Sequence, residues 1–332
     1  MRKKLFSSLQ YIVFLGLGIF LVWWQLKGLK PADQENFLDS LRNANYWLIP
    51  VIVVIVLISH ISRCLRWRIL LEPLGYKPRL SNMFCATMLG YLANSAVPRL
   101  GEVLKCTILA KYEKIPADKL IGTIVAERIF DLVCFIIVIG ITLLSEWTAI
   151  VDFTRNDLSK MGGGFNFTKL YIIVGTFILI VLILAFLFKK YKQNKTIQKI
   201  HGFASGIKAG LSTIKTLKQR KSFIFHTFLI WFMYLLQVYV GFSAMAQVSH
   251  LGFGAAFAVL VAATFAMIAT PGGIGTFPIA IMLILALFKI PDVYGKSFGW
   301  LMWGVSTSII IIVGFICLLV LPTINKNNIE TT

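Results

Sequence analysis

The chain has 332 residues, of which 58% are hydrophobic and only 14% are charged, and its mean hydropathy is +0.80. A water-soluble domain typically carries about 25% charged residues to cover its surface, so this composition excludes a soluble protein and predicts a chain folded mostly within lipid. The net charge is +19. We expect a single integral membrane domain over residues 1–332, multi-pass, in the cell (inner or plasma) membrane, with lipids rather than nucleic acid as its partners.

Six apolar runs are long enough to cross a bilayer as helices, which takes about 17–25 residues. They lie at 5–26, 46–62, 120–144, 168–188, 223–246 and 298–321. The first run is too long for a signal peptide and ends at Trp23 and Trp24 rather than at small residues, so we interpret it as a retained span. Two more apolar runs, 81–111 and 253–288, are each broken in the middle by polar residues, proline and glycine.

The distribution of lysine and arginine predicts the orientation of these runs. If both broken runs enter and leave on one side, 22 Lys/Arg fall on one side of the membrane and 7 on the other. The side richer in Lys/Arg is cytoplasmic in most membrane proteins. If both runs crossed fully, the ten basic residues of 189–222 would face outward, so re-entrant hairpins are favoured.

This topology predicts two inverted halves, about 1–150 and 151–332, each with three spans and one broken hairpin. Paired broken helices in inverted repeats are typical of a central transport site. The predicted fold class is therefore an all-α polytopic membrane protein with six full spans, two re-entrant broken-helix hairpins in an inverted repeat, and both termini in the cytoplasm. The sequence leaves the oligomeric state open.

The segment 189–222 contains ten basic and no acidic residues, and its apolar residues recur at steps of three and four. This pattern predicts an amphipathic helix over 195–218 that lies in the cytoplasmic headgroup layer against anionic lipid headgroups. The alternative is a solvated basic loop.

Six charged residues lie inside or at the margin of the apolar runs, where charge is costly and usually functional. They are Arg99, Glu102, Lys105, Glu127, Arg128 and Asp131. Their charges sum to zero, and their spacing of three or four residues places them on shared helix faces. They either hold the bundle together by salt bridges or form a binding site, and we predict that they meet in one polar cavity.

The first break predicts an anion site. Pro98 suits the first turn of a new helix, and Asn94 or Ser95 can cap that helix. The positive end of the new helix, together with Arg99 in its first turn, would then favour a phosphate group.

The second break carries Pro271, Gly272, Gly273 and Gly275, which permit positive φ angles and can expose backbone N–H groups. This loop is either a second anion site or a tight hairpin tip. No Walker lysine follows it, so nucleotide binding is not expected. The five cysteines and four histidines form no cluster with metal-ligand spacing, so we expect no metal, no cofactor and no catalytic group.

Four ordered groups of residues resemble one known family. They are Arg63, Arg66-Trp67 and Leu70-Leu71; Asn94, Pro98-Arg99, Gly101-Glu102 and Lys105; Glu127-Arg128 and Asp131; and Pro271-Gly272-Gly273-Ile274-Gly275. Together they resemble the lysylphosphatidylglycerol synthase transmembrane family, the flippase-like membrane region of the bacterial multiple peptide resistance factor, which also occurs in standalone proteins.

The resemblance implies movement of an aminoacylated phospholipid, or of a lipid with another charged or glycosyl headgroup, between leaflets. In two-part members the synthase chemistry belongs to a separate soluble domain, so we expect no enzyme activity from the membrane region. Two positions depart from the family pattern. Lys105 stands where the family usually has Arg, and Pro278 stands where it usually has Glu. Loss of that acid implies a substrate other than a lysyl lipid.

The leading hypothesis is therefore a lipid flippase whose substrate phosphate is held by the basic residues and helix ends of the two breaks. One alternative is an integral-membrane transferase acting on polyprenyl-phosphate glycolipids, with an acid of the cluster as general base. Another is an ion-coupled transporter of a small solute. Product formation would distinguish the first alternative, and lipid-independent uptake the second.

Overall fold

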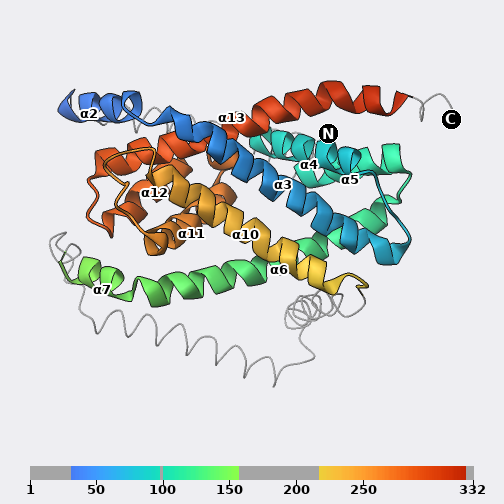
Figure 1. The fold of residues 1–332 in the computed structure, drawn as a ribbon, viewed down its shortest axis with the longest axis horizontal. Helices are drawn as coiled ribbons and strands as arrows, with labels where there is room; N and C mark the ends of the chain where they lie inside the picture. Colours follow the sequence, from blue (N-terminus) through green and yellow to red (C-terminus); the bar gives the residue numbers. More distant parts are fainter. Residues whose placement is uncertain (1–30, 98–99, 157–216, 327–332) are drawn as a thin grey trace, which may run out of the picture.

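The computed structural model describes residues 31–97, 100–156 and 217–326, and every secondary-structure element in these ranges is helical (Figure 1). This agrees with the predicted all-α class. The predicted spans at 5–26 and 168–188 lie outside the described residues. So do Pro98, Arg99 and nearly all of the predicted amphipathic helix at 195–218, of which only Leu217 and Lys218 are described.

The first half supplies two short 3-10 helices, η1 and η2, and six α-helices. These elements are α2 (Pro31–Arg42), η1 (Tyr46–Leu48), α3 (Ile49–Leu71), η2 (Glu72–Leu74), α4 (Leu80–Ala96), α5 (Leu100–Glu113), α6 (Ala117–Ser145) and α7 (Trp147–Asn156). Two of them, α2 and α7, fall in segments that the hydropathy pattern treats as connections between spans. Both pass unnoticed in a search for long apolar runs, because α2 is polar on average and α7 has only ten residues.

The second half supplies the remaining elements. They are α10 (Arg220–Phe242), α11 (Phe253–Ala269), η3 (Pro271–Gly273), α12 (Thr276–Ala286) and α13 (Asp292–Ile324). Each broken apolar run of the sequence thus contains a pair of helices: α4 ends at Ala96 and α5 begins at Leu100, and α11 and α12 are separated by residues 270–275, which include η3.

Three described helical segments have the length and composition to cross a membrane. They are Tyr46–Leu74, Arg220–Phe242 and Asp292–Ile324. A fourth is obtained if α6 and the start of α7 count as one span bent by 69°. These correspond to the predicted spans at 46–62, 223–246, 298–321 and 120–144. The helices extend beyond some of the predicted bounds, because helical hydrogen bonding continues where the apolar run has ended.

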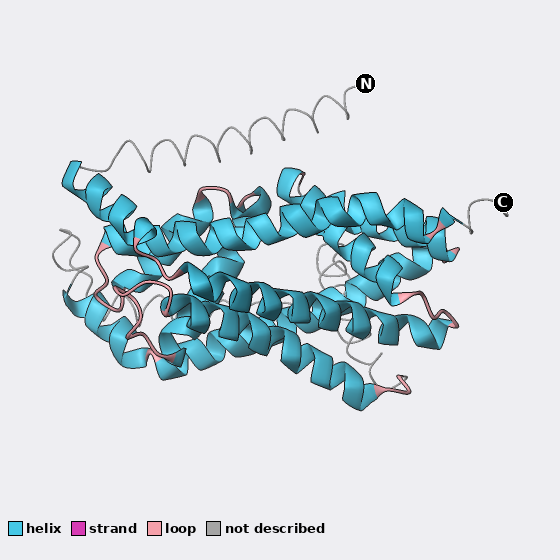
Figure 2. Cartoon of the chain, turned by 45° about the horizontal axis from the view of Figure 1, so that its top comes forward, coloured by secondary structure: helices cyan, strands magenta, loops and turns pink. Residues whose placement is uncertain are grey.

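The pattern of helix contacts relates the two halves to one another. The helices α3 and α10, which occupy matching positions in the two halves, pack side by side (Figure 1). The hairpin helix α4 packs against α13 of the other half, and its counterpart α11 packs against α6. Within each half, the second hairpin helix packs on the helix that follows it, α5 on α6 and α12 on α13. Figure 2 shows the resulting bundle of elongated helices.

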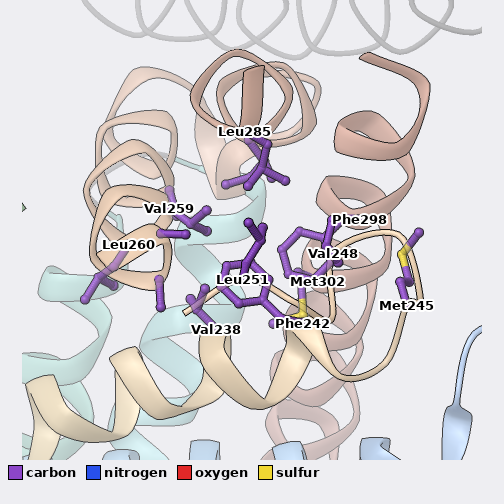
Figure 3. Packing of buried hydrophobic residues seen from close by; sticks show 14 of the residues in the cluster. Val238, Phe242, Met245, Val248, Leu251, Val259, Leu260, Leu285, Phe298 and Met302 are labelled. Carbon is purple, nitrogen blue, oxygen red and sulfur yellow. The ribbon is translucent and has the colours of Figure 1, made fainter. Parts of the chain in front are cut away.

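The second half surrounds a buried apolar core (Figure 3). Phe242 of α10 lies 5.2 Å from Phe298 of α13, measured between ring centroids. Gly241 lets α10 approach α13 closely, since a Cβ there would lie 2.5 Å from the sulfur of Met302. A second apolar cluster, which includes the fully buried Trp67, lies among α3, α4, α5 and α6. The charged residues described below adjoin this second cluster.

Candidate functional site

A buried network of ion pairs joins α3 to α6. Arg63 and Arg66 are three residues apart on α3, and Glu127 and Asp131 are four apart on α6, so each pair shares a helix face. Arg63 Nη1 lies 2.9 Å from an oxygen of each carboxylate. Arg66 Nη2 lies 3.2 Å from Glu127 and 2.7 Å from Asp131. Each arginine therefore bridges both carboxylates in charge-assisted hydrogen bonds.

Lys105 extends this network to the first hairpin. Its Nζ lies 3.4 Å from Glu127 Oε2 and 3.7 Å from the centre of the Trp67 ring. Trp67 is held in place because its indole N–H donates to Thr123 Oγ1 at 2.9 Å. Within this buried network three cations meet two carboxylates, so it carries one net positive charge.

The helix α10 closes the network on the side of the second half. Arg63 Nη2 donates to the hydroxyl oxygen of Tyr234 at 2.9 Å. The residue before Arg63 on α3, Ser62, pairs through its hydroxyl with His226 Nδ1 at 2.9 Å. The site thus includes polar groups from α10 that were not selected from the sequence.

A narrow pocket lies beside the network, between the first hairpin and α6. Its cavity volume is about 10 Å³, which is roughly the space of one water molecule. The charged residues that line it are Arg63, Glu102, Lys105 and Arg128. Glu102 and Arg128 form a partly exposed ion pair of 2.9 Å, with side chains 33% and 53% exposed. Five of the six charged residues selected from the sequence therefore line this pocket or form the network next to it: Glu102, Lys105, Glu127, Arg128 and Asp131.

Asn94 closes the turn between α4 and α5. Its Oδ1 accepts a hydrogen bond of 2.7 Å from the backbone N–H of Gly101 in the first turn of α5. This is the capping role expected for Asn94. Ser95 does not share it, because its hydroxyl donates to the carbonyl of Tyr91 one turn back in α4. Pro98 and Arg99 lie outside the described residues, so their predicted places at this helix end stay predictions.

The second break is a tight loop whose glycines have positive φ angles. The values are +59° at Gly272, +70° at Gly273 and +74° at Gly275, all in the region that glycine adopts readily. The N–H groups of Gly273 and Ile274 donate to carbonyls within the loop, those of Thr270 and Pro271. Because those two N–H groups bond within the turn, they are not available to an anion. This favours the hairpin-tip interpretation for this part of the loop.

The two breaks meet each other. A Cβ built at Gly272 would lie 3.3 Å from Cα of Ser95, at the end of α4. The carbonyl of Gly272 accepts a hydrogen bond of 2.8 Å from the indole N–H of Trp303 on α13. Pro278, in the first turn of α12, packs on α13, where a Cβ at Gly299 would lie 2.7 Å from its Cα. The tips of the two hairpins are therefore adjacent, and α13 supports the second.

Sequence reasoning missed the two arginines of α3. The predicted span at 46–62 ends before Arg63 and Arg66, so the charge count places both among the Lys/Arg of a cytoplasmic connection, but α3 continues to Leu71 and buries both guanidinium groups. That assignment was wrong. Their spacing could have identified them. Arg66 and Trp67 follow Arg63 by three and four residues, so the three side chains lie on one face of a helix that continues beyond the apolar run.

The described part of the chain thus defines a multi-pass helical membrane protein with a buried charged network beside a pair of broken helices. The family described as lysylphosphatidylglycerol synthase TM region matches residues 11–314, and the chain belongs to this family. The match is to the membrane region, and no synthase catalytic domain is found with it.

Several archaeal relatives are similar over most of their length. A UPF0104 membrane protein of Methanocaldococcus jannaschii is 23% identical over 86% of this chain and 88% of its own. A second one from that organism is 28% identical over 59% of this chain and 80% of its own. A UPF0104 membrane protein of Methanothermobacter thermautotrophicus is 24% identical over 79% of this chain and 81% of its own. No solved structure matches the chain significantly.

Proposed function

We propose that the protein translocates a phospholipid or a lipid-linked headgroup between the leaflets of the cell membrane. The observation that supports this most directly is the buried network of Arg63, Arg66, Lys105, Glu127 and Asp131. Buried ion pairs are costly and add little net stability over apolar packing. A membrane protein that keeps five such groups beside a break in its helices has the features expected of a substrate pathway.

The net charge of the network favours the phosphate end of a lipid. Its three cations exceed its two carboxylates by one. Arg63 and Lys105 also line the pocket, which has room for about one water molecule in this structure, so the first hairpin must move away from α6 for a phosphate to reach both side chains. Guanidinium and ammonium groups are the usual partners of phosphate in proteins.

The arrangement of the hairpins supports a path through the molecule. The tips of the two broken runs touch at Gly272 and Ser95, and the elements of the two halves make matching contacts. We infer that the halves are inverted repeats, that the hairpins enter from opposite leaflets, and that the site lies between them, as in other carriers with broken helices. The basic segment 189–222 would then face anionic cytoplasmic headgroups.

The test is lipid flipping in proteoliposomes that contain the purified protein and a phospholipid labelled on its acyl chain. Lys105→Gln is the informative variant, because Glu127 keeps Arg63 and Arg66 as partners and the fold should survive. Lys111→Gln is the matched control, since Lys111 lies on the same helix and is exposed. We expect Lys105→Gln to slow flipping at least about tenfold, the worth of one charge-assisted hydrogen bond, and Lys111→Gln to leave it unchanged.

Two results would contradict the proposal directly. If the wild-type protein flips no lipid, or if Lys105→Gln flips lipid as fast as Lys111→Gln, the site is not a lipid path. Formation of a new lipid product would instead support a transferase, and lipid-independent uptake of a solute would support a transporter of small molecules.

A further inference from the structure

The carboxylates around the pocket are all occupied by cations of the protein itself. Glu127 contacts three cations, Arg63, Arg66 and Lys105. Asp131 contacts both arginines, one with each of its oxygens. Glu102 accepts from Arg128 with one oxygen and lies 3.5 Å from the amide nitrogen of Asn94 with the other. Among the described residues of the site, no carboxylate is left to receive a cationic headgroup.

The spare binding capacity of the site lies instead in its donors. The Nε atoms of Arg63 and Arg66 are buried and have no hydrogen-bond partner within the described part of the protein. The same holds for both ring nitrogens of His60, one turn before Arg63 on α3, whose ring lies 5.0 Å from that of Tyr91. A buried donor without a partner costs stability, so the Nε–H groups of the two arginines indicate a missing acceptor, whereas a neutral His60 ring offers one donor and one acceptor nitrogen.

The second hairpin supplies no further acid. Its entire run, 253–288, contains no Asp or Glu, although its tip touches the first hairpin at Ser95. At the start of α12, Pro278 is buried and packs on α13. A headgroup that enters between the hairpins therefore meets Arg128 and Lys105 but no unpaired carboxylate of either hairpin.

We propose that the lipid bound at this site carries a phosphate anion and a headgroup without an ammonium group. This inference rests on the proposed function and narrows its substrate class. A phosphate, which only accepts hydrogen bonds, would meet the three cations that line the pocket, Arg63, Lys105 and Arg128, whereas an ammonium group would add a cation to a site that already has an excess of them. A diacyl anionic phospholipid and a polyprenyl phosphate share this chemistry.

The test compares three lipids in the same proteoliposomes, each labelled on its hydrophobic chain: phosphatidylglycerol, its lysyl ester and a polyprenyl phosphate. The lysyl ester differs from the first lipid by one esterified lysyl group, which carries two ammonium groups. We expect phosphatidylglycerol or polyprenyl phosphate, whichever is the natural source of the anion, to move at least about tenfold faster than the lysyl ester. If the lysyl ester moves as fast as the faster of the other two, the inference is wrong while lipid translocation stands. If none of the three moves, the proposed function fails and this inference fails with it.

A charge variant provides an independent check. Glu102→Gln removes the carboxylate that pairs with Arg128 and leaves one more free cation at the pocket. We expect it to increase the affinity for the anionic lipid severalfold and to leave the lysyl ester slow. Asp118→Asn removes the same charge from an exposed position on α6 and should change neither. If the Glu102→Gln variant moves the lysyl ester faster than the wild-type protein does, the inference is contradicted.

Discussion

At the scale of single residues, Glu127 is the centre of the buried network. It is 2% exposed and contacts three cations. Glutamine has nearly the same shape but no charge, so Glu127→Gln would leave Arg63 and Arg66 with Asp131 as their single acid and would take from Lys105 the carboxylate that it contacts. Loss of one partner from a buried ion pair costs about 3–5 kcal/mol, and we expect Glu127→Gln to lower the free energy of unfolding in mixed micelles by that amount.

The control Asp118→Asn, on the same helix but exposed, should change the free energy of unfolding by less than about 1 kcal/mol. Equal stability of the two variants would show that the network is not structural.

Asn94 gives a second prediction at this scale. Asn94→Ala removes the acceptor for the N–H of Gly101, and loss of a capping side chain costs about 1 kcal/mol. Ser95→Ala is the natural comparison, because the hydroxyl of Ser95 bonds only within α4. Thermal unfolding in detergent should therefore show a lower midpoint for Asn94→Ala than for Ser95→Ala. The reverse order would be evidence against the capping role.

Some charged residues of the site could be predicted from the sequence and others could not. Glu102, Lys105, Glu127, Arg128 and Asp131 stand out because they interrupt apolar runs, and the structure brings them together. Arg63 and Arg66 follow the last residue of an apolar run, where a basic residue normally marks a loop. Their burial depends on packing of α3 against α6 and α10, which local sequence does not encode.

At the scale of elements, the first hairpin depends on a close approach of two backbones. A Cβ at Gly101 would overlap the carbonyl oxygen of Gly90, and would lie 2.6 Å from Cγ of Asn94. Gly90 and Gly101 stand on opposite sides of the turn, so α4 and α5 run antiparallel and touch at this point. Proline and glycine in the sequence predicted both breaks, because they cannot continue a regular helix without cost. The close contact between the two breaks was beyond prediction, since it brings together residues nearly 180 positions apart.

Gly101→Ala tests this packing. The added methyl group must push α4 and α5 apart, and overpacking of this kind costs about 1–3 kcal/mol. Gly122→Ala on α6 is the matched control, because a Cβ there meets no atom within 4 Å and alanine favours the helix. Unfolding in mixed micelles should show Gly101→Ala less stable and Gly122→Ala at least as stable as the wild type. If Gly101→Ala is neutral, the two helices do not pack as closely as described.

At the scale of the whole molecule, orientation in the membrane follows from charge. All five native cysteines are buried or half-buried, so single cysteines introduced at exposed positions can report sidedness. We predict that a cysteine at Lys119, at the start of α6, is labelled only from the cytoplasm. A cysteine at Asp152, in α7, should be labelled only from outside by a membrane-impermeant maleimide. Labelling of both positions from one side would contradict the inverted arrangement of the halves.

The overall class of this protein could be read from its composition, because a chain with so little charge has few stable folds outside lipid. The relation between its halves could be read only as a pattern of hydropathy. Two equivalent contacts between the halves, α4 with α13 and α11 with α6, agree with that pattern. The chemistry of the substrate could not be predicted from the pattern of the sequence, because the proposal for it depends on which buried groups of the folded protein lack partners.

The central claim is that the pocket beside Lys105 holds the phosphate of a lipid. The most direct test is a cryo-electron microscopy structure of the protein in nanodiscs of phosphatidylglycerol, compared with nanodiscs that contain only lipids with a zwitterionic headgroup. We predict density for a phosphate within hydrogen-bond distance of Lys105 and Arg63 in the first sample, with its acyl chains leaving between the hairpin and α6. A pocket closed by direct side-chain contacts in both samples, with lipid found only around the outside of the bundle, would contradict the claim.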